Sequence, residues 1–276
     1  MKEFRGCPNK NAFKCGYKNY EDINRGRFLA NFLSDKIVLE ESHVLEIGCN
    51  TGAISLGLAE KCKFVSCGDI SKKSINELNI KIKKRKLKNI LAIQLNALSL
   101  PYKENSFDVV ILNGVLEWTP TTNKGNPRDI QVNVLKEVKR VLKKNGLLYL
   151  AIENRYAMNY LLGRKDHSGL RFISFLPRWM ADLYSRIAQK HNYREYLYSV
   201  RGYERLLKEA GFNEIEFYTG IPIYQYPLHI VKLTNKKEIC DAIEKDYKGI
   251  FKFGWNLLAK MGLYKYFGHN FIILAK

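Results

Sequence analysis

Residues 44–52 combine a short apolar run with an acidic residue, two glycines and a polar turn. They read Val-Leu-Glu-Ile-Gly-Cys-Asn-Thr-Gly, and a helical run over residues 53–61 follows at once. Gly48 and Gly52 would let the backbone come close to a nucleotide-like ligand, and the amides at the start of the helix would face that ligand. The pattern therefore predicts a strand, a tight turn and a helix that bind a nucleoside-containing cofactor.

Asp69 ends a second apolar run, residues 64–68, and lies 21 residues after Gly48. At that place a carboxylate could accept hydrogen bonds from ribose hydroxyls. The glycine spacing argues against a dinucleotide turn, because G-x-G-x-x-G would put its second and third glycines at Asn50 and Ala53. A phosphate-binding P-loop fails as well, since the Gly-Lys-Ser/Thr ending is missing.

The pattern Glu46-x-Gly48-x-Asn50-x-Gly52 resembles the first motif of class I S-adenosylmethionine-dependent methyltransferases, in particular the type 11 group. The usual form is Asp/Glu-x-Gly-x-Gly-x-Gly, so Asn50 is the one departure. The resemblance implies that S-adenosylmethionine is the cofactor, that Glu46 orients the turn and the amino-acid end of the cofactor, and that Asn96 reads the adenine amino group. The cofactor-binding residues that it implies are Glu46, Gly48, Cys49, Asn50, Gly52, Asp69, Ile70, Asn96, Ala97, Asn113 and Gly114.

Apolar runs and helical patterns alternate along the rest of the chain. After the first two strands, we expect strands at residues 90–95, 106–112, 146–153, 214–218 and 270–275, and helices at 127–144 and 199–210. This order predicts an α/β fold with a doubly wound, mostly parallel sheet of seven strands. The resemblance implies a Rossmann-like methyltransferase fold, in which the last strand lies antiparallel between the fifth and the sixth.

We expect a single methyltransferase domain over residues 1–276, because a chain of this length with 46% apolar residues can bury a full core. Residues 1–40 would form an N-terminal helical cap. Residues 156–198, after the fifth strand, and 224–268, before the last strand, would be helical insertions. Open α/β sheets bind ligands beyond the carboxyl ends of their strands, so these insertions are expected to form a substrate lid.

His167 is the favoured general base, because histidine titrates near neutral pH and this one lies on a polar loop after the fifth strand. Glu117, after the fourth strand, and Asp166 are the other catalytic candidates. Three arginines of the first insertion could clamp a carboxylate or a phosphate of the acceptor, although surface or structural roles are equally open. They are Arg155, Arg164 and Arg178.

Residues 172–189 mix aromatic, aliphatic and arginine side chains around a proline. They could form an amphipathic lid over the acceptor, or a helix that lies on a membrane and meets a lipid-linked substrate. A lid or a core helix is the favoured interpretation, since most such stripes pack on their own domain.

The net charge is +19, from 46 basic and 27 acidic residues, which would attract polyanions. Eight Lys or Arg side chains gather within residues 72–88. A solvated helix face is favoured there over a nucleic-acid or anionic-membrane patch, because aromatic residues suited to base stacking are missing.

The six cysteines show no metal-binding spacing, so no metal site is predicted, and Cys49 is best interpreted as a small filler. The sequence has no apolar run of 18 residues and no apolar secretion segment at its start, which favours a cytoplasmic protein.

Together these features predict an enzyme that transfers a methyl group from S-adenosylmethionine to a small-molecule acceptor or to a glycan- or lipid-linked one. Nucleic acid is not favoured as a partner, and peripheral membrane contact stays open. Two alternatives remain: an RNA-modifying methyltransferase, which the charge alone favours, and a non-catalytic module that binds S-adenosylmethionine.

Overall fold

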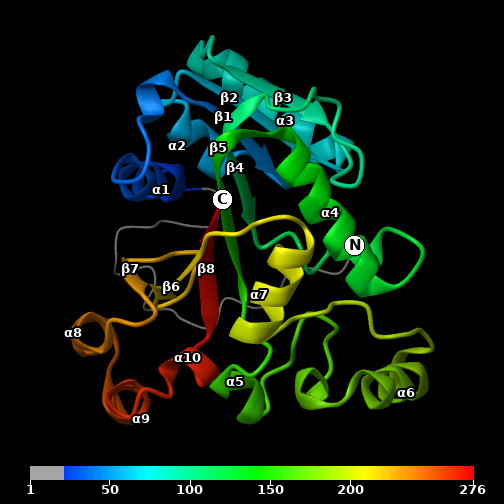
Figure 1. Cartoon of the computed structure of the whole chain (residues 1–276), viewed down its shortest axis with the longest axis vertical. Coiled ribbons are helices and arrows are strands. Elements are labelled where there is room, and N and C mark those ends of the chain that lie inside the picture. The colour runs from blue at the N-terminus through cyan, green and yellow to red at the C-terminus, as the bar shows by residue number, and fades with distance from the viewer. Residues whose placement is uncertain (1–21) are drawn as a thin grey trace.

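The strands expected from the sequence assemble into one sheet in the computed structural model, which describes residues 22–276 (Figure 1). The sheet has eight strands in the order β3-β2-β1-β4-β5-β8-β6-β7. The strands are β1 His43–Ile47, β2 Phe64–Asp69, β3 Ile90–Gln94, β4 Phe107–Asn113, β5 Leu142–Glu153, β6 Ile215–Ile221, β7 His229–Lys232 and β8 Asn270–Ala275.

Strands β1 to β5 are parallel, and β8 lies antiparallel between β5 and β6. The predicted doubly wound sheet and the place of its last strand are thus confirmed. The predicted number of seven strands is wrong, because β7 adds an antiparallel edge next to β6. With four residues, β7 is too short for its alternation to stand out in the sequence.

Helices cover both faces of the sheet, as the alternation of side chains along buried strands requires. The helices are α1 Asn24–Ser34, α2 Ala53–Leu58, α3 Lys72–Arg85, α4 Pro127–Val141, α5 Met158–Leu161, α6 Arg178–Gln189, α7 Val200–Glu209, α8 Lys236–Asp246, α9 Gly249–Lys260 and α10 Tyr264–Phe267. Short 3-10 turns occur at Leu39–Glu41, Thr119–Thr121 and Ile173–Phe175.

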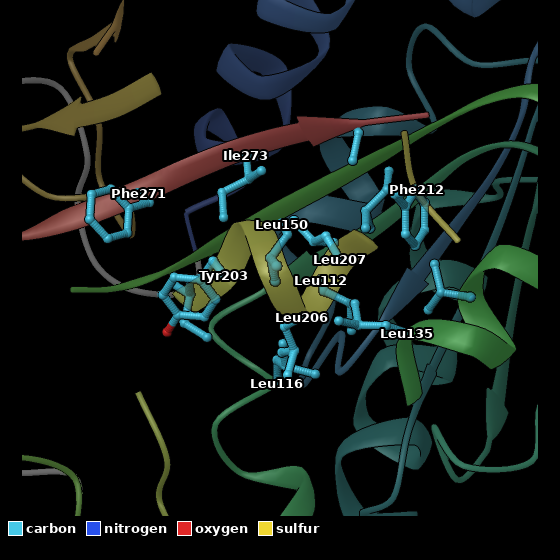
Figure 2. Close-up of a cluster of buried hydrophobic side chains, with 14 of the residues drawn as sticks. Leu112, Leu116, Leu135, Leu150, Tyr203, Leu206, Leu207, Phe212, Phe271 and Ile273 are labelled. Atoms are coloured by element: carbon cyan, nitrogen blue, oxygen red, sulfur yellow. The ribbon is translucent and has the colours of Figure 1, made fainter. Parts of the chain in front are cut away.

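Two apolar cores result, one on each face of the sheet. Helices α1, α2 and α3 pack on the face that carries Val44 and Ile111. Helices α4, α7, α8 and α9 pack on the face that carries Leu45 and Leu112. Figure 2 shows this second core where α7 meets the sheet, and its labelled side chains include Leu150, Tyr203, Leu206, Leu207, Phe271 and Ile273.

Several helix ends follow local rules that the sequence makes visible. Ser71 and Asn126 accept hydrogen bonds from the backbone amides of the first turns of α3 and α4, as expected for N-caps. Helix α4 ends at Val141, before the expected end at residue 144, because β5 begins at Leu142 and pairs with Phe107 of β4.

Helices α1 and α2 cross at two glycines, which brings α1 against the turn after β1. A Cβ added to Gly26 would lie 2.2 Å from the Ile54 carbonyl oxygen, and one added to Gly57 would lie 2.4 Å from the Ile23 carbonyl oxygen. Only glycine permits this close approach. Helix α1 is the described part of the expected N-terminal cap over residues 1–40, and residues 1–21, with Cys7 and Cys15, lie outside the described residues.

The two expected insertions have different contents. Residues 156–198 contain α5 and α6, whereas residues 224–268 contain β7 and the helices α8 to α10. Among residues 22–276, no helix has both the length and the apolar character needed to cross a membrane.

Candidate functional site

The turn after β1 has the backbone conformation that its glycines predict. Gly48 and Gly52 have φ angles of +76° and +85°, in the region that favours glycine. A Cβ added to Gly48 would also lie 2.3 Å from Cγ2 of Val115, which belongs to the loop after β4. The turn therefore lies directly beside the carboxyl end of β4, at the point where the strand order reverses and ligands of open α/β sheets bind.

The backbone conformation of Asn50 explains why asparagine can replace the middle glycine of the motif. Its φ angle is +48°, and asparagine is one of the few residues that adopt this left-handed region readily. Its backbone N–H donates a hydrogen bond of 2.9 Å to Asp69 Oδ2 at the end of β2. Asn50 thus keeps the shape that a middle glycine would provide.

Asp69 connects the loops at the ends of β1 and β2. Besides the Asn50 amide, its carboxylate accepts the Ser71 N–H at 2.8 Å. Each carboxylate oxygen has two lone pairs, so both can still accept a hydroxyl hydrogen from a ligand. The carboxylate is therefore held in place at this edge while it retains the capacity to bind a ribose.

Next to Asp69 lie two of the residues assigned to the base of the cofactor. Ile70 follows β2 with 51% of its surface exposed, which is unusual for a large aliphatic residue at the end of a buried strand. Asn96, exposed after β3, accepts the Leu98 N–H at 3.0 Å with its side-chain oxygen. An apolar surface beside a polar amide suits a purine ring, which stacks on the first and hydrogen-bonds to the second.

Glu46 lies beneath the turn rather than on its surface. It is buried and accepts a hydrogen bond from the Ser55 hydroxyl of α2. Burial raises the pKa of Glu46 to about 7. Cys49 of the same turn is buried too, in agreement with a filler role, so its backbone is the part that can face a ligand.

Arg25 of α1 is a candidate site residue that no pattern in the sequence indicates. Although only 6% exposed, it donates a hydrogen bond of 2.7 Å to the Gln225 carbonyl oxygen. Together with Asn113 and Tyr224 it lines a narrow cavity beside the turn. A buried guanidinium at this place could bind a carboxylate.

Three ionisable side chains meet beyond the carboxyl ends of β4 and β5, and we call them the Glu–His–Glu cluster: Glu117, Glu153 and His167. The His167 Nε2–H donates to Glu153 Oε2 at 2.9 Å, and the same nitrogen lies 3.8 Å from Glu117 Oε1. Within the described part of the chain, neither oxygen of the fully buried Glu117 carboxyl has a hydrogen-bond partner. A carboxyl group buried in this way is costly unless a ligand or a proton satisfies it.

The cluster is held by groups from several elements. The hydroxyl of Tyr224 and the side-chain amide of Gln225 each donate to Glu153 Oε1 at 3.1 Å. The Trp118 ring packs edge-on against the His167 ring at a centroid distance of 4.8 Å. Glu153 and His167 are therefore oriented, whereas Glu117 keeps its acceptor capacity.

Burial and mutual charge shift the pKa values of the cluster. Burial, with the charge of Glu153 adding to it, raises the pKa of Glu117 to about 8. Burial lowers the pKa of His167, but the charge and hydrogen bond of Glu153 outweigh it and raise that pKa to about 9. The imidazole therefore carries a proton at neutral pH. The donor atoms of the three residues lie within 4.8 Å of one another, so a divalent cation could also join them, although the sequence predicted no metal site.

Most of the other residues predicted for catalysis and for acceptor binding make contacts within the first insertion. Asp166 accepts hydrogen bonds from Ser168 and Tyr193, which fixes the loop that carries His167. Arg155 donates to two backbone carbonyls of the first insertion, and Arg178 donates to a third and stacks on Tyr196. Arg164 is exposed. The structure thus brings His167 and Glu117 together, while Arg155 and Arg178 hold the insertion in place.

Residues 45–150 match the family described as the methyltransferase domain. The demethylmenaquinone methyltransferase of Lactococcus lactis subsp. lactis is 27% identical over 182 residues, which cover 63% of this chain and 67% of that protein. The putative methyltransferase YqeM of Bacillus subtilis is 27% identical over 195 residues, with coverages of 63% and 74%. The protein is an S-adenosylmethionine-dependent methyltransferase.

Solved structures agree with the fold of this methyltransferase. A putative sarcosine dimethylglycine methyltransferase from Galdieria sulphuraria has a TM-score of 0.55 at 16% identity, over 92% of this chain and 86% of that one. The [4+2]-cyclase SpnF has a TM-score of 0.54 at 18% identity, over 91% and 80%. Since one is named a methyltransferase and the other a cyclase, the shared fold does not by itself specify a reaction.

The cofactor of this methyltransferase is S-adenosylmethionine. The edge formed by the turn after β1 and the end of β2 fits this ligand, because the turn allows close backbone approach and β2 ends in an oriented ribose acceptor, Asp69, with no cradle for a phosphate. Ile70 and Asn96 fit the adenine, and the buried Arg25 fits the carboxylate of the amino-acid end. Arg25, Glu153 and Tyr224 are absent from the sequence-based set of site residues. Of these three residues, Glu153 could have been selected from the sequence, because an acidic residue at the end of the apolar run of β5 lies at the ligand-binding edge of the sheet.

Proposed function

We propose that this methyltransferase transfers a methyl group to a nucleophile that is bound over the Glu–His–Glu cluster, and that the acceptor is a small molecule or a glycan- or lipid-linked one. The supporting observation is the Glu117 carboxyl, which is fully buried and has neither oxygen hydrogen-bonded by the described residues. It follows β4 by a few residues, on the loop whose Val115 touches the turn after β1. An acceptor there lies between an available proton acceptor and the methyl donor.

The chain's own residues would hold the cofactor along the edge formed by β1, β2 and β4. In this proposal Asp69 binds the ribose, Ile70 and Asn96 bind the adenine, and Arg25 binds the carboxylate. S-adenosylmethionine supplies an electrophilic methyl group when it is bound. Positioning the nucleophile in line with that methyl group provides much of the acceleration.

Proton transfer is assigned to Glu117 rather than to His167. A hydroxyl acceptor must lose its proton as the new bond to carbon forms, whereas an ammonium acceptor must lose one beforehand, so that its nitrogen has a lone pair with which to attack. His167 already carries a proton at neutral pH, because the charge and hydrogen bond of Glu153 raise its pKa to about 9. Burial raises the pKa of Glu117 only to about 8, so Glu117 loses its proton before His167 does as the pH rises. In that ionised form, which the neighbouring imidazolium stabilises, Glu117 can take a proton from the acceptor.

A small-molecule acceptor agrees with the demethylmenaquinone methyltransferases among the relatives. The test is transfer of a labelled methyl group into soluble, lipid and RNA fractions of a cell extract. We expect label in the soluble or lipid fraction. Exclusive labelling of RNA would contradict the proposed acceptor and favour the RNA-modifying alternative, whose basis is the net charge of +19.

The variant Glu117→Gln keeps the size of the side chain and removes its ability to accept a proton. It should lower the transfer rate at least a hundredfold, the usual contribution of a positioned base. Calorimetric affinity for S-adenosylmethionine should stay within twofold, and Glu77→Gln, an exposed glutamate on α3, should behave as the parent protein. Full activity of Glu117→Gln would exclude Glu117 as the proton acceptor.

The same assay separates a proton-transfer cluster from a cation site. Treatment with a chelator should leave the transfer rate unchanged if protons are the only cations that the cluster binds. Loss of activity on chelation, with recovery on adding Mn²⁺ or Zn²⁺, would show that the carboxylates and the imidazole hold a metal ion instead.

A further inference from the structure

Helix α6 presents its apolar stripe to solvent. Trp179 is 67% exposed and Ile187 is 76% exposed, whereas the buried residues of the helix are the small Ala181 and Ser185. The stripe runs the full length of the helix on one face, at a helical spacing. It consists of Trp179, Met180, Leu183, Tyr184 and Ile187.

The rest of the insertion fixes α6 in this orientation. Ala181 packs in a small cluster with Ile173 and Tyr193. The Tyr193 N–H donates to Asp182 Oδ1 at 3.1 Å, and the Gln189 side-chain amide donates to the Ser168 carbonyl oxygen at 2.7 Å. The stripe is therefore not buried against the described part of the domain, as a core helix would require, and a role of α6 as a lid stays a prediction.

The exposed apolar surface continues beyond α6. Phe172 is half exposed and has a φ angle of +62°, a left-handed conformation that is strained for a bulky residue. Its ring lies against Gly163, next to Leu162, which is exposed as well. We call Leu162, Phe172 and the α6 stripe the apolar face.

A second exposed stripe lies on α9, at Phe253, Leu257 and Met261. Figure 1 shows α5, α6, α9 and α10 along the same end of the molecule. Exposed apolar groups at one end of a protein, on helices that do not cross a membrane, are typical of attachment to a lipid surface.

The charge around the apolar face favours an anionic partner. Five exposed basic residues lie within residues 161–191, whereas the two aspartates of this range are not exposed and are hydrogen-bonded inside the insertion. The exposed basic residues are Arg164, Lys165, Arg171, Arg186 and Lys190. Tryptophan and basic side chains beside an apolar stripe suit the headgroup region of a bilayer with anionic lipids.

We propose that the apolar face docks this protein on the surface of an anionic membrane, with α6 lying in the headgroup region. The loop with His167 would then face the membrane at short range, because Gln189 of α6 holds Ser168 and Tyr193 holds Asp166. A lipid-dissolved or lipid-linked acceptor could enter the site from that side. The docking goes beyond methyl transfer and does not depend on it.

The test is co-sedimentation of the full chain with vesicles of phosphatidylglycerol and phosphatidylcholine, compared with phosphatidylcholine alone. The parent protein should bind the anionic vesicles, and its tryptophan emission, to which Trp179 contributes beside Trp118 and Trp255, should shift to the blue. The triple variant Trp179→Ser, Leu183→Ser, Ile187→Ser should bind at least tenfold more weakly, with unchanged affinity for S-adenosylmethionine as a measure of folding. Val38→Ser with Ile80→Ser, which alters exposed apolar residues elsewhere, should bind as the parent does.

Three results would overturn the proposal. The parent protein could fail to bind anionic vesicles. The triple variant could bind as tightly as the parent, while Lys83→Glu with Lys84→Glu on α3 abolishes binding, which would assign the membrane contact to α3. Sedimentation velocity could show a dimer that the triple variant dissociates, which would assign the apolar face to a second copy of the chain.

Discussion

Glu117 is the residue whose burial should lower the stability of the fold and whose carboxyl group we propose as the proton acceptor in methyl transfer. Its carboxyl group is fully buried, and the described residues leave both oxygens without a hydrogen bond. An unsatisfied buried polar group costs about 1–3 kcal/mol, and an ionised one costs more. This unfavourable group lies close to the turn that fits the cofactor. Buried ionisable groups with shifted pKa values are common at functional sites.

The cost of burying the Glu117 carboxyl group should make the free energy of unfolding depend on pH. Because burial raises the pKa of Glu117 to about 8, the folded protein retains a proton that the unfolded chain releases near pH 4.5. Stability from this group is therefore complete at low pH and is lost as the pH rises through about 8. Glu117→Gln should be more stable than the parent, and its advantage should grow by at most about 1.4 kcal/mol per pH unit between pH 5 and 8.

Urea unfolding at pH 5, 6, 7 and 8 measures this effect, and Glu40→Gln, at an exposed site, is the matched control. The remaining pH dependence of Glu117→Gln should come from His167, which is also stabilising below its raised pKa of about 9. A constant difference between Glu117→Gln and the parent at all four pH values would contradict the pKa assigned to Glu117.

Asp69 should determine cofactor affinity. Asp69→Asn retains one oxygen acceptor but removes the charge that strengthens hydrogen bonds to ribose hydroxyls. Since such bonds contribute about 1.5–3 kcal/mol, we expect affinity for S-adenosylmethionine to fall about tenfold to a hundredfold. Calorimetry with the parent protein, Asp69→Asn and the exposed-site control Asp35→Asn would show it, and equal affinities would exclude Asp69 as a ribose ligand.

At the scale of elements, the turn between β1 and α2 positions the site through its backbone. Gly48 has a positive φ angle and touches Val115 of the loop after β4, so any side chain there is both strained and in collision. Asn50 tolerates its left-handed conformation and ties the turn to Asp69. Position 50 therefore tolerates a residue other than glycine, whereas position 48 does not.

Gly48→Ala should lower the free energy of unfolding by about 2 kcal/mol or more and weaken cofactor binding, because it adds a left-handed alanine and overpacks Val115. Asn50→Gly should change stability by no more than about 1 kcal/mol and leave binding intact, since glycine adopts the same φ angle. Thermal unfolding with and without S-adenosylmethionine compares the two variants. If Gly48→Ala bound normally and were as stable as Asn50→Gly, the turn would not have the role described.

At the scale of the whole molecule, local patterns in the sequence predicted the scaffold well. The turn at residues 44–52 and the last strand at residues 270–275 depend on neighbouring residues, and both are present in the fold. The short edge strand β7 was not predicted, because four residues are too few for an alternation of apolar and polar side chains to be recognised.

Contacts between distant residues were not predictable in the same way. Glu117, Glu153 and His167 meet only when β4, β5 and the first insertion are assembled, and Arg25 reaches the site only because α1 crosses α2 at two glycines. The orientation of α6 could not be predicted from the sequence either. An apolar stripe has the same spacing whether it faces a core or a membrane, and only its exposure in the fold distinguishes the two.

A crystal structure with S-adenosylhomocysteine, the demethylated product of the cofactor, would test the proposed site most directly. We expect its adenine beside Ile70 and Asn96, its ribose hydroxyls on Asp69, and its sulfur next to Gly114, with an open path to Glu117. A sulfur atom separated from the Glu–His–Glu cluster by protein atoms would contradict the proposal that the acceptor is methylated over Glu117.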